Sequence, residues 1–306
     1  MFFLSKLSGL LIFLSFLTTL YSYFFSENLL IIAGIFAWVS FLILFSSLKN
    51  KTIIIVLLIL SVFAFCFSYF NGYKIDFVKV FTVNQYLLTL LIGVGFLRLI
   101  ATPKKDKLTQ FPIGKDSFIK TYFGVHLFGS VINLSSLILV ADKMYKKSPL
   151  TNTQVVLLTR AFASDAYWSP FFVAFAAAIT YAPKLDTSII LLNGIVLAFF
   201  AFLITYFEVV KNKEFKLDEF RGYPLSFESL YVPFILAILV LVTNYIYPNI
   251  KVIVLISTFS IFITLLIFPF KKGLSQSLIK FNNHVIEELP KMKVEIALFL
   301  VAGMFG

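Results

Sequence analysis

Charged residues are scarce in this chain of 306 residues, since Lys, Arg, Asp and Glu together make up 13% of it. Soluble domains average about 25% charged residues, so the composition excludes an ordinary water-soluble surface. Hydrophobic residues make up 60% of the chain, including 39 Phe. They form successive long runs without the polar–apolar alternation of a membrane β-barrel. The sequence therefore predicts an all-α polytopic membrane protein.

Cysteine and histidine are almost missing as well. The single cysteine, Cys66, lies inside an apolar run, which excludes a disulfide framework and a thiolate metal site. His126 and His284 have no spaced Cys, Asp or Glu partner, so we do not expect a zinc site. A Walker-type loop and a G-x-S-x-G turn are also absent from the sequence. We therefore predict that the protein is not an enzyme and has no cofactor, with Na⁺ as a candidate bound ion.

Positive charges outnumber negative ones, with 26 Lys and Arg against 15 Asp and Glu. They lie in short loops between apolar runs, so we interpret them as residues that set membrane topology and face an anionic leaflet. We therefore predict no nucleic-acid partner. The expected partners are membrane lipid and a small-molecule solute, with a homodimer as a candidate assembly. Lys6 precedes the first apolar run, which has no cleavage site. This pattern predicts a multi-pass protein of the inner (cytoplasmic) membrane with a cytoplasmic N-terminus.

The apolar runs predict about nine spanning helices, together with one re-entrant hairpin and one broken helix. The runs cover residues 7–25, 29–47, 53–70, 78–100, 118–140, 155–182, 187–209, 230–247 and 252–270. About 20 residues are needed to cross the hydrocarbon core. A last run begins at Glu295 and stops at Gly306, which is too short to cross.

The run 118–140 is predicted to be a re-entrant hairpin that enters from the cytoplasm. If the run crossed the membrane, the basic residues just after it would lie outside. If it dips in and returns, every later basic loop is cytoplasmic, as the positive-inside rule favours. Two arms of about ten residues would each reach roughly 15 Å, half of the core. The break between the arms is expected around Gly124, Gly129, Ser130 and Asn133.

The run 155–182 is predicted to be a spanning helix that is broken near the membrane midplane. Pro170 lies near its middle, and proline removes a backbone donor and clashes with the preceding turn. Polar and ionisable side chains at membrane depth usually face a cavity and mark a functional site. We therefore predict a substrate and ion site at the hairpin tip and the helix break, formed by Ser130, Asn133, Ser135, Ser136, Arg160, Ser164, Asp165 and Ser169.

Several of these residues have alternative interpretations. Asp165 is expected to bind Na⁺ or a proton, or to pair with Arg160; a purely structural pair near the interface is the alternative. The hydroxyl and amide groups suit a hard cation or a carboxylate, but such groups also bond across packed helices. His126 is interpreted as a satisfied buried histidine, with proton sensing as the alternative. Trp168 is interpreted as packing or an interface anchor rather than a pocket wall, and Glu208 as an interfacial residue.

Two further segments are predicted to lie at the membrane surface. The basic stretch 103–117 precedes the predicted hairpin as an interfacial link. The stretch 274–289 has apolar residues at helical spacing with polar residues between them, which predicts an amphipathic helix on the membrane, or a soluble elbow.

The order of elements resembles the ion transporter superfamily, which includes divalent anion/sodium symporters and arsenite-type pumps. Four leading spans and a basic link are followed by a hairpin containing GSVINLSS and a broken helix containing RAFASDAYWSP. The resemblance implies two inverted repeats, each with a hairpin and a broken helix that bind sodium and a substrate carboxylate. It implies that Ser130 and Asn133 are ligands at the hairpin tip, and Ser164 and Ser169 at the break. It also implies a complete first repeat and a second repeat truncated at Gly306.

These features together predict a secondary active transporter, or a truncated part of one, that moves a small anionic solute with Na⁺ or H⁺. Residues 1–117 would form the leading scaffold, 118–210 half of the transport site, and 211–306 the start of a second repeat. One alternative is a membrane enzyme or polymerase acting on lipid-linked sugars, although the short predicted outside loops argue against it. The other alternative is a non-functional transporter remnant.

Overall fold

The computed structural model describes residues 2–49, 51–101, 111–132, 134–182, 184–223 and 231–304. Within these ranges the chain is helical and contains no β-strand, and one isolated β-bridge joins Ile113 to Arg221. The chain divides into two compact units, which are described separately. The first unit comprises Met1–Phe96 and Thr264–Gly306, and the second comprises Leu97–Ile263.

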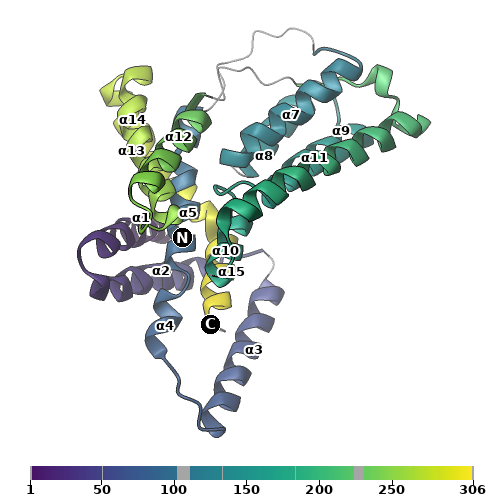
Figure 1. Ribbon diagram of the computed structural model, residues 1–306. Coiled ribbons are helices and arrows are strands. Elements are labelled where there is room, and N and C mark those ends of the chain that lie inside the picture. The colour runs from purple at the N-terminus through teal and green to yellow at the C-terminus, as the bar shows by residue number, and fades with distance from the viewer. Residues whose placement is uncertain are drawn as a thin grey trace. The chain divides into compact units, whose positions relative to one another are not determined.

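The first unit is built around two long apolar helices that lie side by side, α1 and α2 (purple in Figure 1). Its helices are α1 (Phe2–Phe25), α2 (Leu30–Phe45), α3 (Lys51–Phe70), α4 (Phe77–Thr82), α5 (Gln85–Phe96), α14 (Leu274–Asn283) and α15 (Lys293–Gly303), with a π-helix at His284–Glu288. Helix α13 (Val252–Lys272) crosses the division between the units. The segment before α5 and the C-terminal helix are tied together because Asn84 Nδ2 donates to the carbonyl of Phe299 at 2.7 Å.

The amphipathic segment predicted over 274–289 is helical, as α14 followed by the π-helix. Gly273 makes the turn between α13 and α14 with a φ of 79°, a value that glycine adopts without strain. The small polar side chain of Ser277 faces inward and donates to the carbonyl of Phe268 at 3.0 Å. Leu274 and Leu278 are exposed on the helix, as expected where apolar side chains meet lipid.

Six helical segments among the described residues are long and apolar enough to cross a membrane: Phe3–Phe25, Glu27–Phe45, Lys51–Phe70, Phe77–Ile100, Thr187–Lys211 and Val252–Lys272. The chain is therefore an all-α, multi-pass membrane protein, as its composition predicted. The count is lower than the nine predicted spans, and the nine-span count stays a prediction. Three predicted runs account for the difference: 118–140 and 155–182 are each covered by two shorter helices, and 230–247 is covered by one helix of 16 residues, Tyr231–Ile246.

The second unit contains α6 (Arg98–Ala101), α7 (Lys115–Ile132), α8 (Leu134–Tyr145), α9 (Asn152–Ala163), α10 (Val173–Tyr181), α11 (Thr187–Lys211) and α12 (Tyr231–Ile246). Helices α7 and α8 fold back on each other (Figure 1). Phe118 near the start of α7 and Met144 near the end of α8 belong to one buried apolar cluster. Met144 also lines a pocket with Phe111 and Ile113, which precede α7. The pair is therefore a helical hairpin whose open ends lie together.

The arms of this hairpin are unequal. Helix α7 has 18 residues and α8 has 12, against about ten predicted for each. Gly124 and Gly129, which were predicted to lie at the break, lie within α7 instead. Asn133, also predicted at the break, lies outside the described residues. The longer first arm results from helical turns that begin at Lys115, before the apolar run. Re-entry of this hairpin into a membrane stays a prediction.

The predicted break in the next run is present. Helix α9 ends at Ala163, a 3₁₀ turn covers Ser164–Tyr167, and α10 begins only at Val173. Helix α11 packs against this break, where Gly194 approaches the backbone of Tyr167 so closely that an added Cβ would collide with its carbonyl. The break is thus fixed by a neighbouring long helix as well as by Pro170.

Several basic residues lie at one end of the second unit, near the start of α7, the end of α8 and the segment after α11. Lys143 Nζ donates to the hydroxyl of Tyr223 at 2.7 Å, and Lys147 lines a pocket with Arg221. A hydrogen bond to Tyr206 raises the pKa of the Lys115 ammonium, which favours its charged form. The start of α7, the end of α8 and the segment after α11 therefore meet on one basic side.

Candidate functional site

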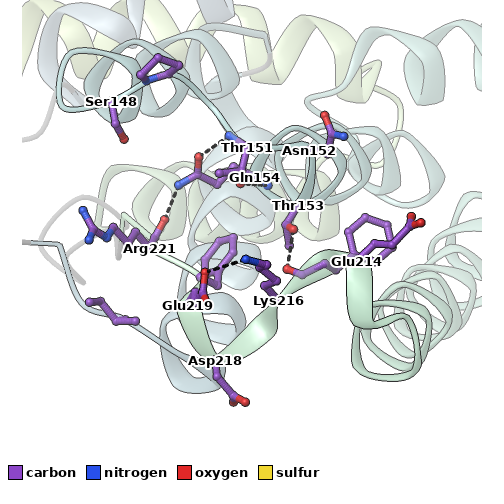
Figure 2. Close-up of a pocket in the computed structure, with 14 residues that line it drawn as sticks. Ser148, Thr151, Asn152, Thr153, Gln154, Glu214, Lys216, Asp218, Glu219 and Arg221 are labelled. Carbon is purple, nitrogen blue, oxygen red and sulfur yellow. Dashed lines mark hydrogen bonds and ion pairs between the residues drawn. The ribbon is translucent and has the colours of Figure 1, made fainter.

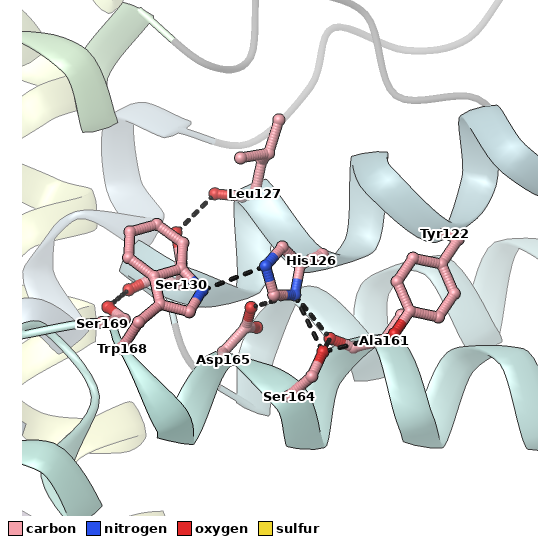
Figure 3. Close-up of polar contacts among 9 residues, drawn as sticks. All are labelled: Tyr122, His126, Leu127, Ser130, Ala161, Ser164, Asp165, Trp168 and Ser169. Carbon is pink, nitrogen blue, oxygen red and sulfur yellow. Dashed lines mark hydrogen bonds and ion pairs between the residues drawn. The ribbon is translucent and has the colours of Figure 1, made fainter. Parts of the chain in front are cut away.

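The candidate site lies where α7 meets the break after α9 (Figure 3). Asp165 in the 3₁₀ turn lies against Gly129, and a Cβ added at Gly129 would collide with Asp165 Oδ2. The hydroxyl of Ser169 donates to the backbone carbonyl of Ser130, near the end of α7. Two segments that the sequence predicted to converge are therefore in direct contact.

His126 is the centre of the polar contacts. Its Nδ1 atom lies 3.1 Å from the carbonyl of Ala161, 3.0 Å from Ser164 Oγ and 2.8 Å from Asp165 Oδ1. On the opposite side of the ring, Trp168 Nε1 donates to His126 Nε2 at 3.0 Å. The interpretation of His126 as a satisfied buried histidine is confirmed, because both ring nitrogens have partners.

These partners determine the tautomer of His126. An indole N–H can only donate, so His126 Nε2 must carry the lone pair that accepts from Trp168. The ring proton of neutral His126 therefore sits on Nδ1, which is surrounded by three oxygen atoms. The Ser164 hydroxyl in turn donates to the carbonyl of Ala161 at 2.9 Å, which leaves its lone pairs directed toward the ring.

Asp165 is fully buried, yet its carboxyl group is poorly satisfied. Oδ1 is within ion-pair distance of His126 Nδ1, but neither oxygen forms a properly directed hydrogen bond to another described residue. The hydrogen on Nδ1 is directed toward the carbonyl of Ala161. A buried carboxylate without hydrogen bonds is costly, so the arrangement is suited to binding a cation or a proton.

The structure brings together most of the serines predicted for the site. Ser130 and Ser136 are buried on α7 and α8, and Ser136 Oγ lies 3.1 Å from the position of a Cβ added at Gly129. Ser164 and Ser169 are buried on either side of Asp165. Asn133 lies outside the described residues, as does the side chain of Ser135. Pro170 lies in the irregular segment between Tyr167 and Val173.

Arg160 is placed differently from the pairing considered for it. Its Nη1 atom forms an ion pair with Glu208 Oε2 at 2.5 Å, rather than with Asp165. The two side chains are 40% and 43% exposed, whereas Asp165 is 0% exposed. The Arg160–Asp165 pair is therefore wrong, because Glu208 on α11 faces Arg160 on α9 and Asp165 points toward α7. A role of Arg160 as a substrate ligand stays a prediction.

Three contributors to this arrangement were not assigned to the site from the sequence. They are His126, Trp168 and Gly129. A signal for His126 was available, since it precedes Ser130 by one helical turn and so shares its face of α7. Trp168 follows Asp165 by three residues, but only the non-helical backbone of the break directs the indole toward His126. No sequence signal could have shown which helix Gly129 approaches.

A separate polar pocket of about 660 Å³ lies at the start of α9 (Figure 2). Its polar groups are largely bonded to one another. Thr153 Oγ1 donates to the carbonyl of Phe215, and Gln154 Nε2 donates to the carbonyl of Arg221, both at 2.7 Å. Thr151 and Gln154 also form a capping box. The pocket therefore anchors the beginning of α9 to the segment after α11, and it offers a ligand fewer unsatisfied groups than Asp165 does.

Within the described ranges, no three His, Cys, Asp or Glu side chains gather closely enough to hold a metal ion. No family model matches the chain, and the comparisons found no similar curated protein and no similar solved structure. The buried Asp165 and the residues around it are therefore the basis for assigning a function.

Proposed function

We propose that the protein is a secondary active transporter, or part of one, that moves a small anionic solute across the cytoplasmic membrane with Na⁺ or H⁺. The observation that carries this proposal is the buried Asp165, which lacks directed hydrogen bonds where a helical hairpin meets a helix break. Transporters place ion and substrate sites at such discontinuous helices near the membrane midplane. An ionisable residue at membrane depth is by default a functional residue.

The helix termini at the site support binding of charges of both signs. Helix α9 ends at Ala163, two residues before Asp165, and helix C-termini carry partial negative charge that favours a cation. Helix α10 begins at Val173, after the break, and helix N-termini favour an anion. The hydroxyl of Ser136 lies in the first turn of α8 and is a candidate donor to a carboxylate.

The hairpin and the basic side of the second unit support a re-entrant placement. The open ends of α7 and α8 lie together, and the basic residues Lys143, Lys147 and Arg221 lie at that end. The positive-inside rule places such a basic side in the cytoplasm. The Arg160–Glu208 pair is separated from Asp165 and would lie closer to this side.

The topology can be tested with a single cysteine at Tyr145, the exposed last residue of α8. The native Cys66 is exposed, so it is first replaced by serine. In right-side-out vesicles we expect an impermeant maleimide to leave Tyr145→Cys unlabelled until the membrane is opened, because the hairpin returns to the cytoplasm. A cysteine at Asn71, in the turn after α3, serves as the externally labelled control. Labelling of Tyr145→Cys from outside would end the re-entrant assignment.

Transport itself is tested by reconstituting the full chain into proteoliposomes. We expect labelled small organic anions to accumulate under an imposed Na⁺ or pH gradient and not in protein-free liposomes. A panel of mono- and dicarboxylates, phosphate and arsenite covers the anionic and oxyanionic solutes. If no solute in this panel accumulates under either gradient, the transporter proposal fails.

A further inference from the structure

We propose that the coupling ion is a proton bound by Asp165, and that Trp168 ensures this by holding His126 neutral. The inference rests on the proposed function and specifies its ion. It is carried by the arrangement of Asp165, His126 and Trp168, which lie on α7 and in the helix break (Figure 3).

Trp168 prevents His126 from taking up a second proton while the observed contacts persist. Imidazolium carries hydrogen on both ring nitrogens, so Nε2 would become a donor. That hydrogen would face the indole N–H of Trp168 across 3.0 Å, and two donors cannot share one hydrogen bond. The next proton therefore binds where a lone pair is unused, on the Asp165 carboxyl group. Trp168 acts as a positioning residue.

The surroundings of the Asp165 carboxyl group leave room for a proton rather than for a hydrated or multiply coordinated cation. Oδ1 lies 2.8 Å from His126 Nδ1, which carries hydrogen and repels a cation on that side. Oδ2 abuts Gly129, where not even a methyl group would fit. Hard metal cations require several oxygen ligands around them, as Ca²⁺ does with six to eight. A proton requires only one lone pair and no additional space.

The other titratable groups around the site are not placed to bind the proton in place of Asp165. Tyr122 on α7 lies 3.4 Å from Ser164 Oγ and interacts electrostatically with Asp165 and Tyr167. Arg160 on α9 is paired with Glu208 on α11. Helix α8 contributes the hydroxyl of Ser136, and α11 approaches the break through Gly194, which has no side chain. Asp165 is thus the acidic group that a proton reaches in this cluster.

The proton step is a simple acid–base exchange. A hydronium ion transfers its proton to one oxygen of the Asp165 carboxylate, an O–H bond forms, and water is left behind. Release to the opposite side reverses the step and restores the carboxylate. His126 keeps its Nδ1–H bond throughout, directed toward the carbonyl of Ala161, so its own charge does not change while the neighbouring carboxylate gains and loses the proton.

Infrared and NMR spectroscopy of the full chain in lipid nanodiscs test the assignment without measuring transport. Acidification protonates other members of the 15 Asp and Glu as well, so spectra of variants are subtracted from that of the unaltered protein. We expect a protonated-carboxyl component that is missing in Asp165→Asn and retained in Asp142→Asn, which alters an exposed aspartate on α8. The sequence has two histidines, so His284→Gln leaves His126 as the single ¹⁵N-imidazole signal. That signal should remain the neutral Nδ1–H tautomer at the acidic pH that protonates Asp165.

Trp168→Phe separates the positioning role of Trp168 from a packing role. Phenylalanine keeps an aromatic ring but removes the donor to Nε2, so His126 should now become imidazolium on acidification. An imidazolium signal in the protein with Trp168 intact would overturn the proposal, as would a protonated-carboxyl spectrum that is identical in Asp165→Asn and the unaltered protein.

Transport then distinguishes failure of the ion assignment from failure of the proposed function. Accumulation driven by a pH gradient without Na⁺ supports the proton. Accumulation that requires a Na⁺ gradient and is unaffected by pH gradients overturns the proton while it retains the transporter. If no uptake occurs but the Asp165-dependent carboxyl band is present, the proposed transport function and the coupling role are both overturned. Asp165 would then remain a protonation site only.

Discussion

Asp165→Asn is expected to lower gradient-driven solute accumulation at least about 100-fold, which corresponds to about 2.8 kcal/mol at 1.4 kcal/mol per tenfold change. Asparagine has nearly the shape of aspartate, but it can neither bind nor release the coupling ion. Because it resembles the protonated acid, solute exchange without a gradient should persist better than net accumulation. Initial rates of both processes in proteoliposomes measure this difference.

Folding of the variant is checked before its rates are compared. Asp142→Asn makes the same chemical change at an exposed position on α8, where Asp142 pairs with Lys146 across one helical turn. We expect Asp142→Asn to transport at the original rate, since exposed ion pairs of this kind contribute little. Equal activities of Asp165→Asn and the unaltered protein would remove Asp165 from the ion site.

Gly129→Ala is expected to destabilise the protein by about 1–3 kcal/mol, the usual cost of an extra group in a well-packed interior. The added methyl group would collide with Asp165 Oδ2 and approach the hydroxyl of Ser136. Helix α7 and the break would therefore have to separate, so solute accumulation should fall as well. The thermal unfolding temperature of the purified protein reports the first effect, and proteoliposome uptake reports the second.

Gly95→Ala is the matched control. Gly95 lies within α5 in the other unit, and a Cβ added there would meet its nearest atom, His284 Nε2, at 3.9 Å. Alanine is favoured over glycine inside helices by up to about 1 kcal/mol, so this variant should be as stable as the original protein or more so. Equal destabilisation by both substitutions would show that the close contact at Gly129 does not cause the loss of stability.

Membrane class and the two helix interruptions could be predicted from the sequence because they depend on local properties. Long apolar runs indicate helices wherever they occur. Pro170 and the serines around it indicated the break between Ala163 and Val173, and the charge distribution indicated that α7 and α8 fold back. Gly124 and Gly129, predicted to interrupt the hairpin, lie inside α7 instead, so the presence of glycine did not locate the break.

The partners within the site could not be predicted, because they depend on which helix faces meet. Arg160 and Asp165 are close in sequence, but they lie on different faces, and Arg160 pairs with Glu208 instead. His126 and Trp168 are 42 positions apart in the sequence, and nothing local indicates their hydrogen bond. Such long-range contacts are determined by packing among α7, α9 and α11 rather than by local sequence.

The two short helices around the break also affect how the protein is made. Helix α9 with 12 residues reaches about 18 Å and α10 with nine residues about 14 Å, so neither crosses a hydrocarbon core of about 30 Å. Helix α9 also carries Arg160, whose charge is paired with Glu208 near the end of α11. Residues 152–181 are therefore unsuited to entering the bilayer alone as they leave the ribosome. Their stable insertion awaits synthesis of α11, which couples the biogenesis of the two segments.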